Sequence, residues 1–277
     1  MNKKIGFIFA LVVIAFLVMG SASAGFFDFL GSGNGGSNNN VTNDNSTFIV
    51  GFDSEFPPYG YSDGNGGYTG FDLDLAQEVC NRNNWTLVKQ PINWDSKDAE
   101  LDSGSIDCIW NGFTIDGREN NYTWSEPYVD NKQVVVVKSD ANINSLADLA
   151  GKNVEVQTDS SALKALQGDN KTIADTFGNL NQVADYNTAF MDLKSGACDA
   201  VAMDVNTAHY DINSSADFKI LNDTITSEKY GIGFKLGNTQ LKDQVQSTLD
   251  EMYADGTVDK IAANYSDYGV PEALIHK

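Results

Sequence analysis

Positive charge is scarce in this sequence. Its 18 lysine and arginine residues stand against 38 aspartate and glutamate residues, which gives a formal net charge of −20 at pH 7. Such a surface repels nucleic-acid phosphates and anionic lipid headgroups, so nucleic-acid binding is excluded as a function. The only two arginines are Arg82 and Arg118, so an arginine beside a predicted ligand site is not a generic surface charge.

Cysteine and histidine are also rare. With three cysteines and two histidines, the chain is not a disulfide-dense scaffold, and a histidine-rich metal site is not expected. We expect no metal and no cofactor. Cys80, Cys108 and Cys198 fall in apolar patterns, which predicts buried packing residues, with a Cys80–Cys108 disulfide as the alternative.

The N-terminus has the pattern of an export signal. Two lysines precede an apolar run from Ile5 to Met19 and a small-residue end at Ala24, which predicts a secretory signal over residues 1–24. The apolar run is almost long enough to span a bilayer, so an uncleaved membrane tether is the alternative. In either case we expect the rest of the chain in the periplasm or at the cell surface. Residues 25–46, rich in Gly, Ser and Asn, are predicted to be a flexible linker.

Strand and helix patterns alternate along the rest of the chain. They predict strands over residues 48–52, 106–110, 133–138, 154–157 and 197–203, and helices from Phe71 and over residues 145–150, 162–166 and 188–193. The helix from Phe71 places Asp72 and Asp74 at its positive end. This alternation predicts an α/β fold with a mostly parallel sheet covered on both faces.

One short motif occurs twice. Leu101 to Asp107 and Leu193 to Asp199 both read L-x-S-G-x-x-D. In each copy we expect a helix to end at the Ser-Gly pair and an apolar strand to follow. The motif is a common helix–strand junction, but here it separates halves of similar length, which favours two similar α/β lobes.

Polar residues follow three of the predicted strands, at the strand ends where α/β sheets bind ligands. They are Asn111, Gly112, Thr114 and Arg118 after the first, Ser160 and Ser161 at a helix start after the second, and Asp204 after the third. Such a set complements a zwitterion. Arg118 would bind a carboxylate with help from the two serine amides, and Asp204 would bind an ammonium group. Structural ion pairs are the alternative for Arg118 and Asp204.

Five stretches carry a family resemblance. They are Val50–Tyr59 (VGFDSEFPPY), Gly70–Ala76 (GFDLDLA), Ser105–Thr114 (SIDCIWNGFT), Tyr230–Phe234 (YGIGF) and Asp255–Ile261 (DGTVDKI). In this order they resemble the polar amino-acid-binding proteins of ABC importers, the family-3 extracellular solute-binding proteins. The resemblance covers about Ser46 to Tyr268, and the loop before Arg118 is one residue shorter than the common pattern.

The resemblance implies a two-lobed, periplasmic-binding-protein-like (type II) fold with a ligand cleft between the lobes and two hinge crossings. Lobe 1 would hold residues 47–137 plus 230–277, and lobe 2 residues 138–229. The implied function is an extracytoplasmic, monomeric protein that captures a free amino acid by lobe closure. It would deliver this amino acid to the membrane permease subunits of an ABC importer.

The resemblance also implies roles for site residues. Phe56 and Trp94 would clamp the ligand's side chain, with core packing as the alternative for both. Gly112 and Thr114 match positions that hold the ligand's amino and carboxylate groups. Gln157 aligns with a position that contacts the side chain, and Asn111 could face the ligand at its strand end.

Two other function classes were weighed. An enzyme on the same scaffold, such as a dehydratase of a small organic acid, would need a general acid or base in the cleft, and Glu55 is the only candidate nearby. No G-x-S-x-G, H-E-x-x-H or Cys/His pair occurs. A receptor ectodomain would need a transmembrane helix and a signalling domain beyond Tyr268, which we do not expect. We therefore expect a binding protein and not an enzyme.

Overall fold

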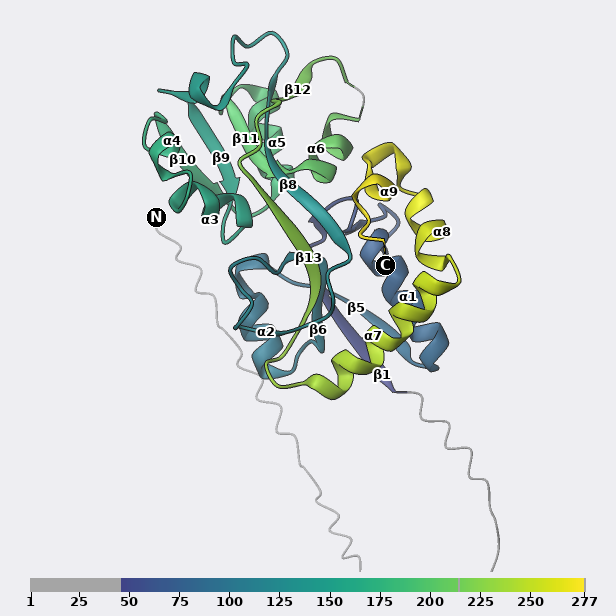
Figure 1. The fold of residues 1–277 in the computed structure, drawn as a ribbon. Coiled ribbons are helices and arrows are strands. Elements are labelled where there is room, and N and C mark those ends of the chain that lie inside the picture. The colour runs from purple at the N-terminus through teal and green to yellow at the C-terminus, as the bar shows by residue number, and fades with distance from the viewer. Residues whose placement is uncertain (1–45, 214, 277) are drawn as a thin grey trace, which may run out of the picture. The chain divides into compact units, whose positions relative to one another are not determined.

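The computed structural model describes residues 46–213 and 215–276. The predicted signal at 1–24 and nearly all of the predicted linker at 25–46 lie outside the described residues. In the described part, one ten-stranded mixed sheet runs through the fold, and helices pack on its two faces (Figure 1). The α/β prediction is confirmed, but the sheet is not mostly parallel as expected, because β8 (Val129–Lys138) and β13 (Thr226–Phe234) pair antiparallel with each of their neighbours.

The sheet has a single path with two side branches. Its order is β10 (Asn179–Val183), β9 (Asn153–Gln157), β11 (Ala200–Asp204), β8 (Val129–Lys138), β13 (Thr226–Phe234), β6 (Cys108–Thr114), β1 (Thr47–Phe52) and β5 (Thr86–Pro91). β12 (Phe218–Ile220) pairs with β8, and β7 (Thr123–Trp124) pairs with β13. β2 (Glu55–Phe56), β3 (Gly60–Ser62) and β4 (Tyr68–Thr69) form a separate small sheet.

The helices divide between the two ends of this sheet. The α-helices are α1 (Phe71–Asn83), α2 (Lys97–Ser103), α3 (Ser161–Gln167), α4 (Lys171–Ala174), α5 (Tyr186–Ser195), α6 (Val205–Ile212), α7 (Thr239–Ala254), α8 (Thr257–Ala263) and α9 (Val270–Ala273). Short 3₁₀ helices are η1 (Trp94–Ser96), η2 (Leu146–Leu149) and η3 (Ser266–Tyr268). The helix predicted over 145–150 is thus only the short η2.

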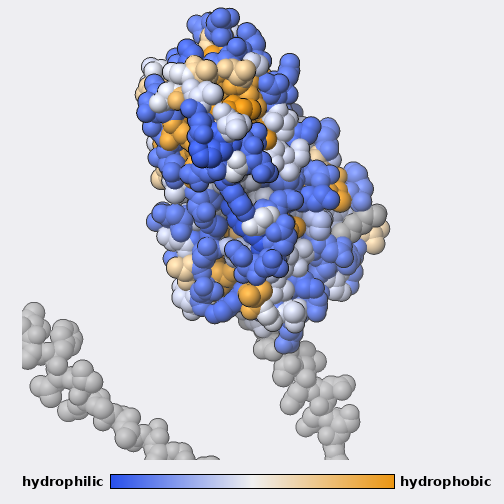
Figure 2. All heavy atoms as spheres, turned by 60° about the vertical axis from the view of Figure 1, so that its left-hand side comes forward, coloured by the Kyte–Doolittle hydropathy of each residue, from blue (hydrophilic) through white to orange (hydrophobic). Residues whose placement is uncertain are grey.

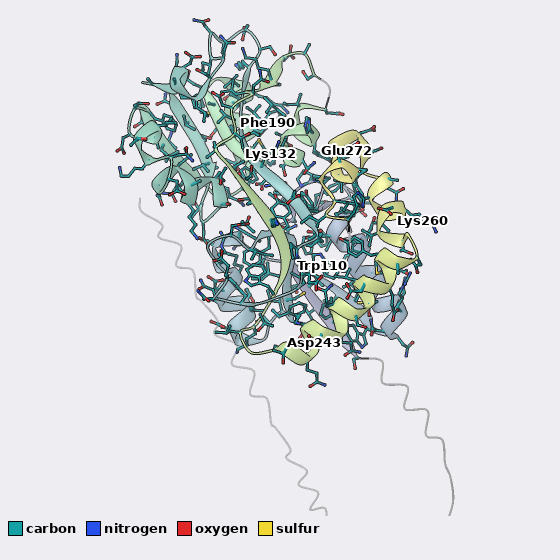
Figure 3. The ribbon with its side chains drawn as sticks, in the orientation of Figure 1. Trp110, Lys132, Phe190, Asp243, Lys260 and Glu272 are labelled. Atoms are coloured by element: carbon teal, nitrogen blue, oxygen red, sulfur yellow. The ribbon has the colours of Figure 1, made fainter. Side chains whose placement is uncertain are left out.

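Two lobes follow from this arrangement. One is built around β1, β5 and β6 with α1, α2, α7 and α8, and the other around β9, β10 and β11 with α3, α4 and α5. In Figure 3 the labels Trp110 and Phe190 mark the two lobes, and both side chains are buried. The repeated L-x-S-G-x-x-D motif ends a helix in each lobe. α2 ends at Gly104 with a left-handed φ of 79°, and α5 ends at Gly196 with a left-handed φ of 83°.

β8 and β13 connect the lobes. Thr226–Tyr230 of β13 pairs with Val129–Gln133 of β8, and the rest of β13 continues along β6. Beyond this paired segment, β8 runs along β11 from Gln133 to Val137. Because the sheet is continuous through these strands, the predicted lobe boundaries at 137/138 and 229/230 stay a prediction.

One predicted strand is longer than expected. β6 covers Cys108–Thr114, whereas the pattern predicted a strand over 106–110 followed by a loop. The extension forms because Phe113 and Thr114 pair with Gly231 and Tyr230 of the distant β13. Asn111, Gly112 and Thr114, which were expected to follow the strand, therefore lie on it.

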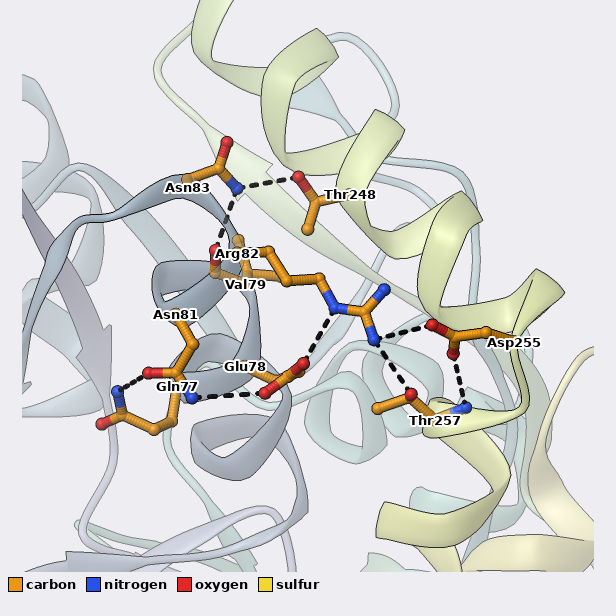
Figure 4. A network of polar contacts seen from close by, with 9 residues as sticks. All are labelled: Gln77, Glu78, Val79, Asn81, Arg82, Asn83, Thr248, Asp255 and Thr257. Atoms are coloured by element: carbon orange, nitrogen blue, oxygen red, sulfur yellow. Dashed lines mark hydrogen bonds and ion pairs between the residues drawn. The ribbon is translucent and has the colours of Figure 1, made fainter. Parts of the chain in front are cut away.

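The chain's C-terminal helices return to α1. The Arg82 guanidinium at the end of α1 forms ion pairs with Glu78 at 2.8 Å and Asp255 at 2.9 Å and donates to Thr257 (Figure 4). Asn83 also donates to Thr248 of α7 at 2.8 Å. Arg82 is thus a structural residue, which leaves Arg118 as the arginine available to a site.

The interior and surface agree with the composition. Cys80, Cys108 and Cys198 are buried and unbridged, so the prediction of packing residues is confirmed. Hydrophilic residues dominate the face in Figure 2, with hydrophobic residues only in small patches. In the part of the chain that the structure describes, no helix combines the length and apolar character needed to cross a bilayer.

Candidate functional site

A cavity of about 310 Å³ contains every predicted site residue. Its lining comprises Phe56, Trp94, Asn111, Gly112, Thr114, Arg118, Gln157, Ser160, Ser161 and Asp204, together with Asp53, Gln133 and Tyr186, which the sequence analysis did not select. The residues come from both lobes and from β8. This volume includes space open to solvent, and only about 20 Å³ of it admits a water-sized molecule, so in this conformation the side chains nearly fill the cavity. That each residue binds a ligand stays a prediction.

Three strand ends bring these residues together. β6 of one lobe ends at Thr114, while β9 and β11 of the other end at Gln157 and Asp204. The Ser160 side chain caps α3 by accepting from the Leu163 amide at 3.1 Å. Because strand ends and helix starts meet at one edge of an α/β sheet, residues distant in sequence share one cavity.

Arg118 is anchored by carbonyl groups. Its side chain is nine-tenths buried, Nη1 donates to the Thr114 carbonyl at 3.2 Å, and Nη2 donates to the Asp159 carbonyl at 3.1 Å. Its Cζ lies 5.2 Å from the centroid of the Phe113 ring. Among the described residues no ion pair joins Arg118 to a carboxylate, which removes the structural ion pair as the alternative. The guanidinium is held in place by these two carbonyl groups.

Asp204 is a buried carboxylate surrounded by donors. Its Oδ1 accepts from Asn131 and Gln133, both at 2.7 Å, and from the Tyr230 hydroxyl, while Oδ2 accepts from Tyr186 at 3.1 Å. Burial, and after it the nearby charge of Glu228, raises the pKa of Asp204 to about 7. No cationic side chain pairs with Asp204 within the described residues, so a cationic group from outside would be favoured.

Asp53 is a second carboxylate in the cavity wall. It directly follows β1 and is 6% exposed. Its Oδ2 accepts from Gln157 of the other lobe at 2.6 Å and its Oδ1 from the Glu55 amide at 2.9 Å. Burial raises the pKa of Asp53 from 3.8 to about 6. No ion pair to a lysine or arginine is present in the described structure, so this charge also has no protein counter-ion.

Aromatic side chains form the apolar part of the cavity. The Phe56 ring centroid lies 5.8 Å from that of Tyr186, across the lobes, and Trp94 packs edge-on against Phe113 at 5.4 Å. Gly112 has a φ of 52°, and a Cβ there would lie 2.7 Å from Phe56 Cε1. Glycine is therefore required at 112 to let the Phe56 ring lie against the strand.

The β6 segment is held by Asp72. Its carboxylate is fully buried and accepts from the Gly112 amide at 2.6 Å and from the Tyr128 hydroxyl at 2.8 Å. Asp72 thus does more than stabilise the positive end of α1. Asn111 in turn accepts from the Asp53 amide at 3.0 Å, which orients Asp53 toward the cavity.

The sequence pattern indicated the three additional lining residues, Asp53, Gln133 and Tyr186, to different degrees. Asp53 follows a predicted strand, so the strand-end rule applied to Arg118 and Asp204 would have found it. Gln133 lies two residues from Asn131, and this alternation marks one face of β8. Tyr186 had no local signal, because its position depends on the packing of α5 against β2.

The arrangement suits binding more than catalysis. No histidine, cysteine or lysine occurs among the described residues that line the cavity. No group of three or more His, Cys, Asp or Glu side chains within residues 46–213 and 215–276 could hold a metal ion. The charged groups are one guanidinium and two carboxylates.

Comparisons with known proteins identify the family of this chain. Residues 48–268 match the family model for bacterial extracellular solute-binding proteins, family 3. The L-cystine-binding protein TcyJ of Escherichia coli K12 is 26% identical over 230 residues, which cover 82% of this chain and 85% of that protein.

Solved structures give the same result. An ABC uptake transporter substrate-binding protein from Streptococcus pneumoniae, with bound histidine, is 31% identical with a TM-score of 0.77, covering 80% of this chain and 93% of the other. An ancestral arginine-binding protein bound to arginine is 35% identical with a TM-score of 0.74, covering 79% and 98%. These relatives are solute-binding proteins, so the enzyme alternative is not supported. The prediction from the sequence is confirmed: this chain belongs to the bacterial extracellular solute-binding proteins of family 3 and has their two-lobed fold.

Proposed function

We propose that this protein binds a free amino acid with a positively charged side chain and presents it to an ABC importer. The observation that carries the proposal is a set of three buried ionisable groups that have no ion-pair partner among the described residues: Arg118, Asp204 and Asp53. An amino acid with a cationic side chain carries one anionic and two cationic groups, which matches this set in number and sign. Buried charges are tolerated when they are paired, so such a ligand completes the site.

The main-chain groups of the ligand would occupy the Arg118–Asp204 end of the cavity. Arg118 presents its remaining N–H donors to the carboxylate in a planar fork. The Ser160 amide donates to the Gln157 carbonyl at 3.3 Å, so we assign the assisting amide to Ser161 and give Ser160 the capping role. Asp204 takes the ammonium group, together with Thr114 on the facing strand.

The side chain of the ligand would extend toward Asp53 and Gln157, between Phe56 and Trp94. A cationic side chain would pair with Asp53, and the aromatic rings would cover its apolar part. The similar proteins named above for histidine and arginine support this choice. Cystine, the ligand in the name of TcyJ, carries a second ammonium group that could also reach Asp53, so the binding experiment includes it.

Binding would close the two lobes. Several contacts already cross the cleft: Gln157 donates to Asp53, Lys164 donates to the Gly117 carbonyl at 2.5 Å, and Lys97 forms an ion pair with Asp159. We place the hinge in the segments of β8 and β13 that pair with each other. A ligand that touches both lobes stabilises the closed state more than the open one, which is what shifts the population.

The cellular setting is part of the same proposal. Family membership implies a protein outside the cytoplasm that works with an importer. We propose that residues 1–24 direct export and are either cleaved or kept as a tether. We also propose that the protein works as a monomer and that its closed form is recognised by the permease subunits.

A thermal-shift screen with isothermal titration calorimetry tests the function. The panel is L-arginine, L-lysine, L-histidine, L-cystine, L-glutamine and L-glutamate. A ligand at 100 times its Kd adds about 2.7 kcal/mol to the free energy of unfolding. We expect arginine, lysine or histidine to give the largest shift and glutamate none. Binding of none of the six, or a preference for glutamate, would contradict the proposal.

A further inference from the structure

Two buried carboxylates share two amide groups beside the cavity. Asn131 Nδ2 donates to Asp204 Oδ1 at 2.7 Å and to Glu228 Oε1 at 2.8 Å. Gln133 Nε2 donates to the same two oxygens, both at 2.7 Å. The remaining Glu228 oxygen, Oε2, accepts from the Ser161 hydroxyl. Glu228 therefore contacts the ammonium site only through these residues.

The strand register creates this cluster. Asn131 of β8 lies opposite Glu228 of β13, and Gln133 lies opposite Asp204 of β11. Residues alternate between the faces of a strand, so these four side chains share the inner face. All four are 4% exposed or less. Their outward neighbours Asp130 and Lys132 on β8 are exposed, and Figure 3 labels Lys132 there.

The amide orientations follow from the carboxylates. Asn131 and Gln133 turn their NH₂ groups toward Asp204 Oδ1 and Glu228 Oε1, and both of these carboxyl oxygens accept. The oxygens Asn131 Oδ1 and Gln133 Oε1 then have no partner among the described residues, although both are buried. Gln133 also lines the cavity, so its oxygen is a second acceptor for a ligand ammonium group beside Asp204.

The charges around the cluster do not neutralise it. No ion pair involves Asp204 or Glu228 within the described chain. The titratable and charged groups that face the cluster are Tyr59, Tyr186 and Tyr230 in the interior, Arg118 and Asp53 across the cavity, and Asp116, Asp130, Lys132 and Lys229 on the outer side of the hinge strands. Burial raises the pKa of all three tyrosines well above their ordinary value, so they stay neutral.

We propose that Glu228 is a positioning residue that favours the protonated form of Asp204 in the ligand-free protein, so that binding of the ligand's ammonium group displaces this proton to solvent. This inference rests on the proposed function, because it needs an amino acid as ligand. The exchange conserves charge: a proton leaves Asp204 and an ammonium group takes its place. The two amides hold the carboxylate in the same position in both states.

The pH dependence of ligand affinity follows from the effect of the bound ammonium group on the pKa of Asp204. Desolvation and the charge of Glu228 raise the pKa of ligand-free Asp204 to about 7, and a bound ammonium group lowers it. Affinity is therefore greatest above pH 7 and falls below it, by up to about tenfold per pH unit. Binding at pH 7 should release about half a proton per ligand.

Calorimetry of the wild type and Glu228→Gln tests the proposal. The probe is L-arginine, or whichever of the six panel amino acids binds more tightly. Titration at pH 7 in phosphate and in Tris gives the number of protons released from the difference in heat. The glutamine side chain keeps an acceptor for both amide NH₂ groups but carries no charge. We expect the variant to release clearly less than the wild type and to lose affinity at a pH about one unit lower.

A matched control removes one exposed carboxylate elsewhere. Glu251→Gln lies on the exposed side of α7 and should keep the wild-type proton release and pH profile. Asp53 is present in all three proteins, so its own titration cancels in the comparison. Wild-type binding without proton release, or an identical pH profile in Glu228→Gln, would overturn this inference alone. Absence of binding at every pH would overturn the proposed function with it.

If Glu228→Gln does not fold, a measurement on the wild type tests the same proposal. In the wild type, the carboxyl ¹³C signal of Asp204 should show a protonation event near pH 7. Saturating ligand should remove that event from the range above pH 5. Absence of the event, or a titration that the ligand does not change, would refute the coupling.

Discussion

Replacement of Asp53 by asparagine should weaken ligand binding while it stabilises the ligand-free protein. The wild-type carboxylate is 6% exposed, and its pKa is raised from 3.8 to about 6. Because the folded-state pKa lies above the ordinary value, ionising Asp53 destabilises the fold. This cost develops as the pH rises from about 4 through 6 and is constant above that range. At pH 7.5 it is roughly 3 kcal/mol, at about 1.36 kcal/mol per pKa unit.

Asparagine removes this cost but weakens one hydrogen bond. Gln157 Nε2 donates to Asp53 Oδ2 and to the Ala184 carbonyl. An asparagine at position 53 would accept a weaker hydrogen bond from Gln157 than the carboxylate does, which costs about 1 kcal/mol of stability. The ligand-free variant should therefore be more stable by up to about 2 kcal/mol, a rise in Tm of a few degrees for a domain of this size. Arginine binding should weaken by about 10- to 150-fold, since a hydrogen bond to a charged group contributes about 1.5–3 kcal/mol.

Thermal unfolding and calorimetry at pH 7.5 measure both effects. Glutamine, which has no side-chain charge, should bind to wild type and Asp53→Asn with affinities within about threefold of each other. Asp169→Asn, which removes an exposed carboxylate on the surface, is the matched control and should change neither quantity. The reasoning is refuted if arginine affinity is unchanged, or if Asp53→Asn lowers the ligand-free Tm as well as the affinity for both amino acids.

Three further predictions concern the rest of the site. Arg118→Lys keeps the charge but loses the planar fork and the bonds to two carbonyls, so we expect at least tenfold weaker binding with a Tm within a few degrees of wild type; unchanged affinity by calorimetry would remove Arg118 from the site. Asp204→Asn should weaken α-amino acids while leaving analogues without the amino group unaffected, and an equal loss for both would contradict its assignment to the ammonium group. Small-angle scattering should show a smaller radius of gyration at saturation, and an unchanged radius with binding confirmed independently would rule out lobe closure but not binding.

Residue chemistry made much of the site predictable. Arg118 and Asp204 were found because charged residues at strand ends meet in an α/β fold, whatever the exact strand lengths. The family resemblance then identified Phe56, Trp94 and Gln157, and all of the predicted residues line one cavity. The same logic applied to the first strand would have added Asp53.

Composition and local pattern determined the α/β class and the burial of the cysteines, because each depends on residue type and short-range spacing. Only the tertiary structure decided the length of β6 and the meeting of Gln133, Asp204 and Glu228. These features depend on strand pairing between segments far apart in the chain, and a one-residue change of register would turn the same side chains to the opposite face. The contacts between the two carboxyl groups are therefore set by strand pairing, whereas the presence of the two acidic residues is set by the sequence.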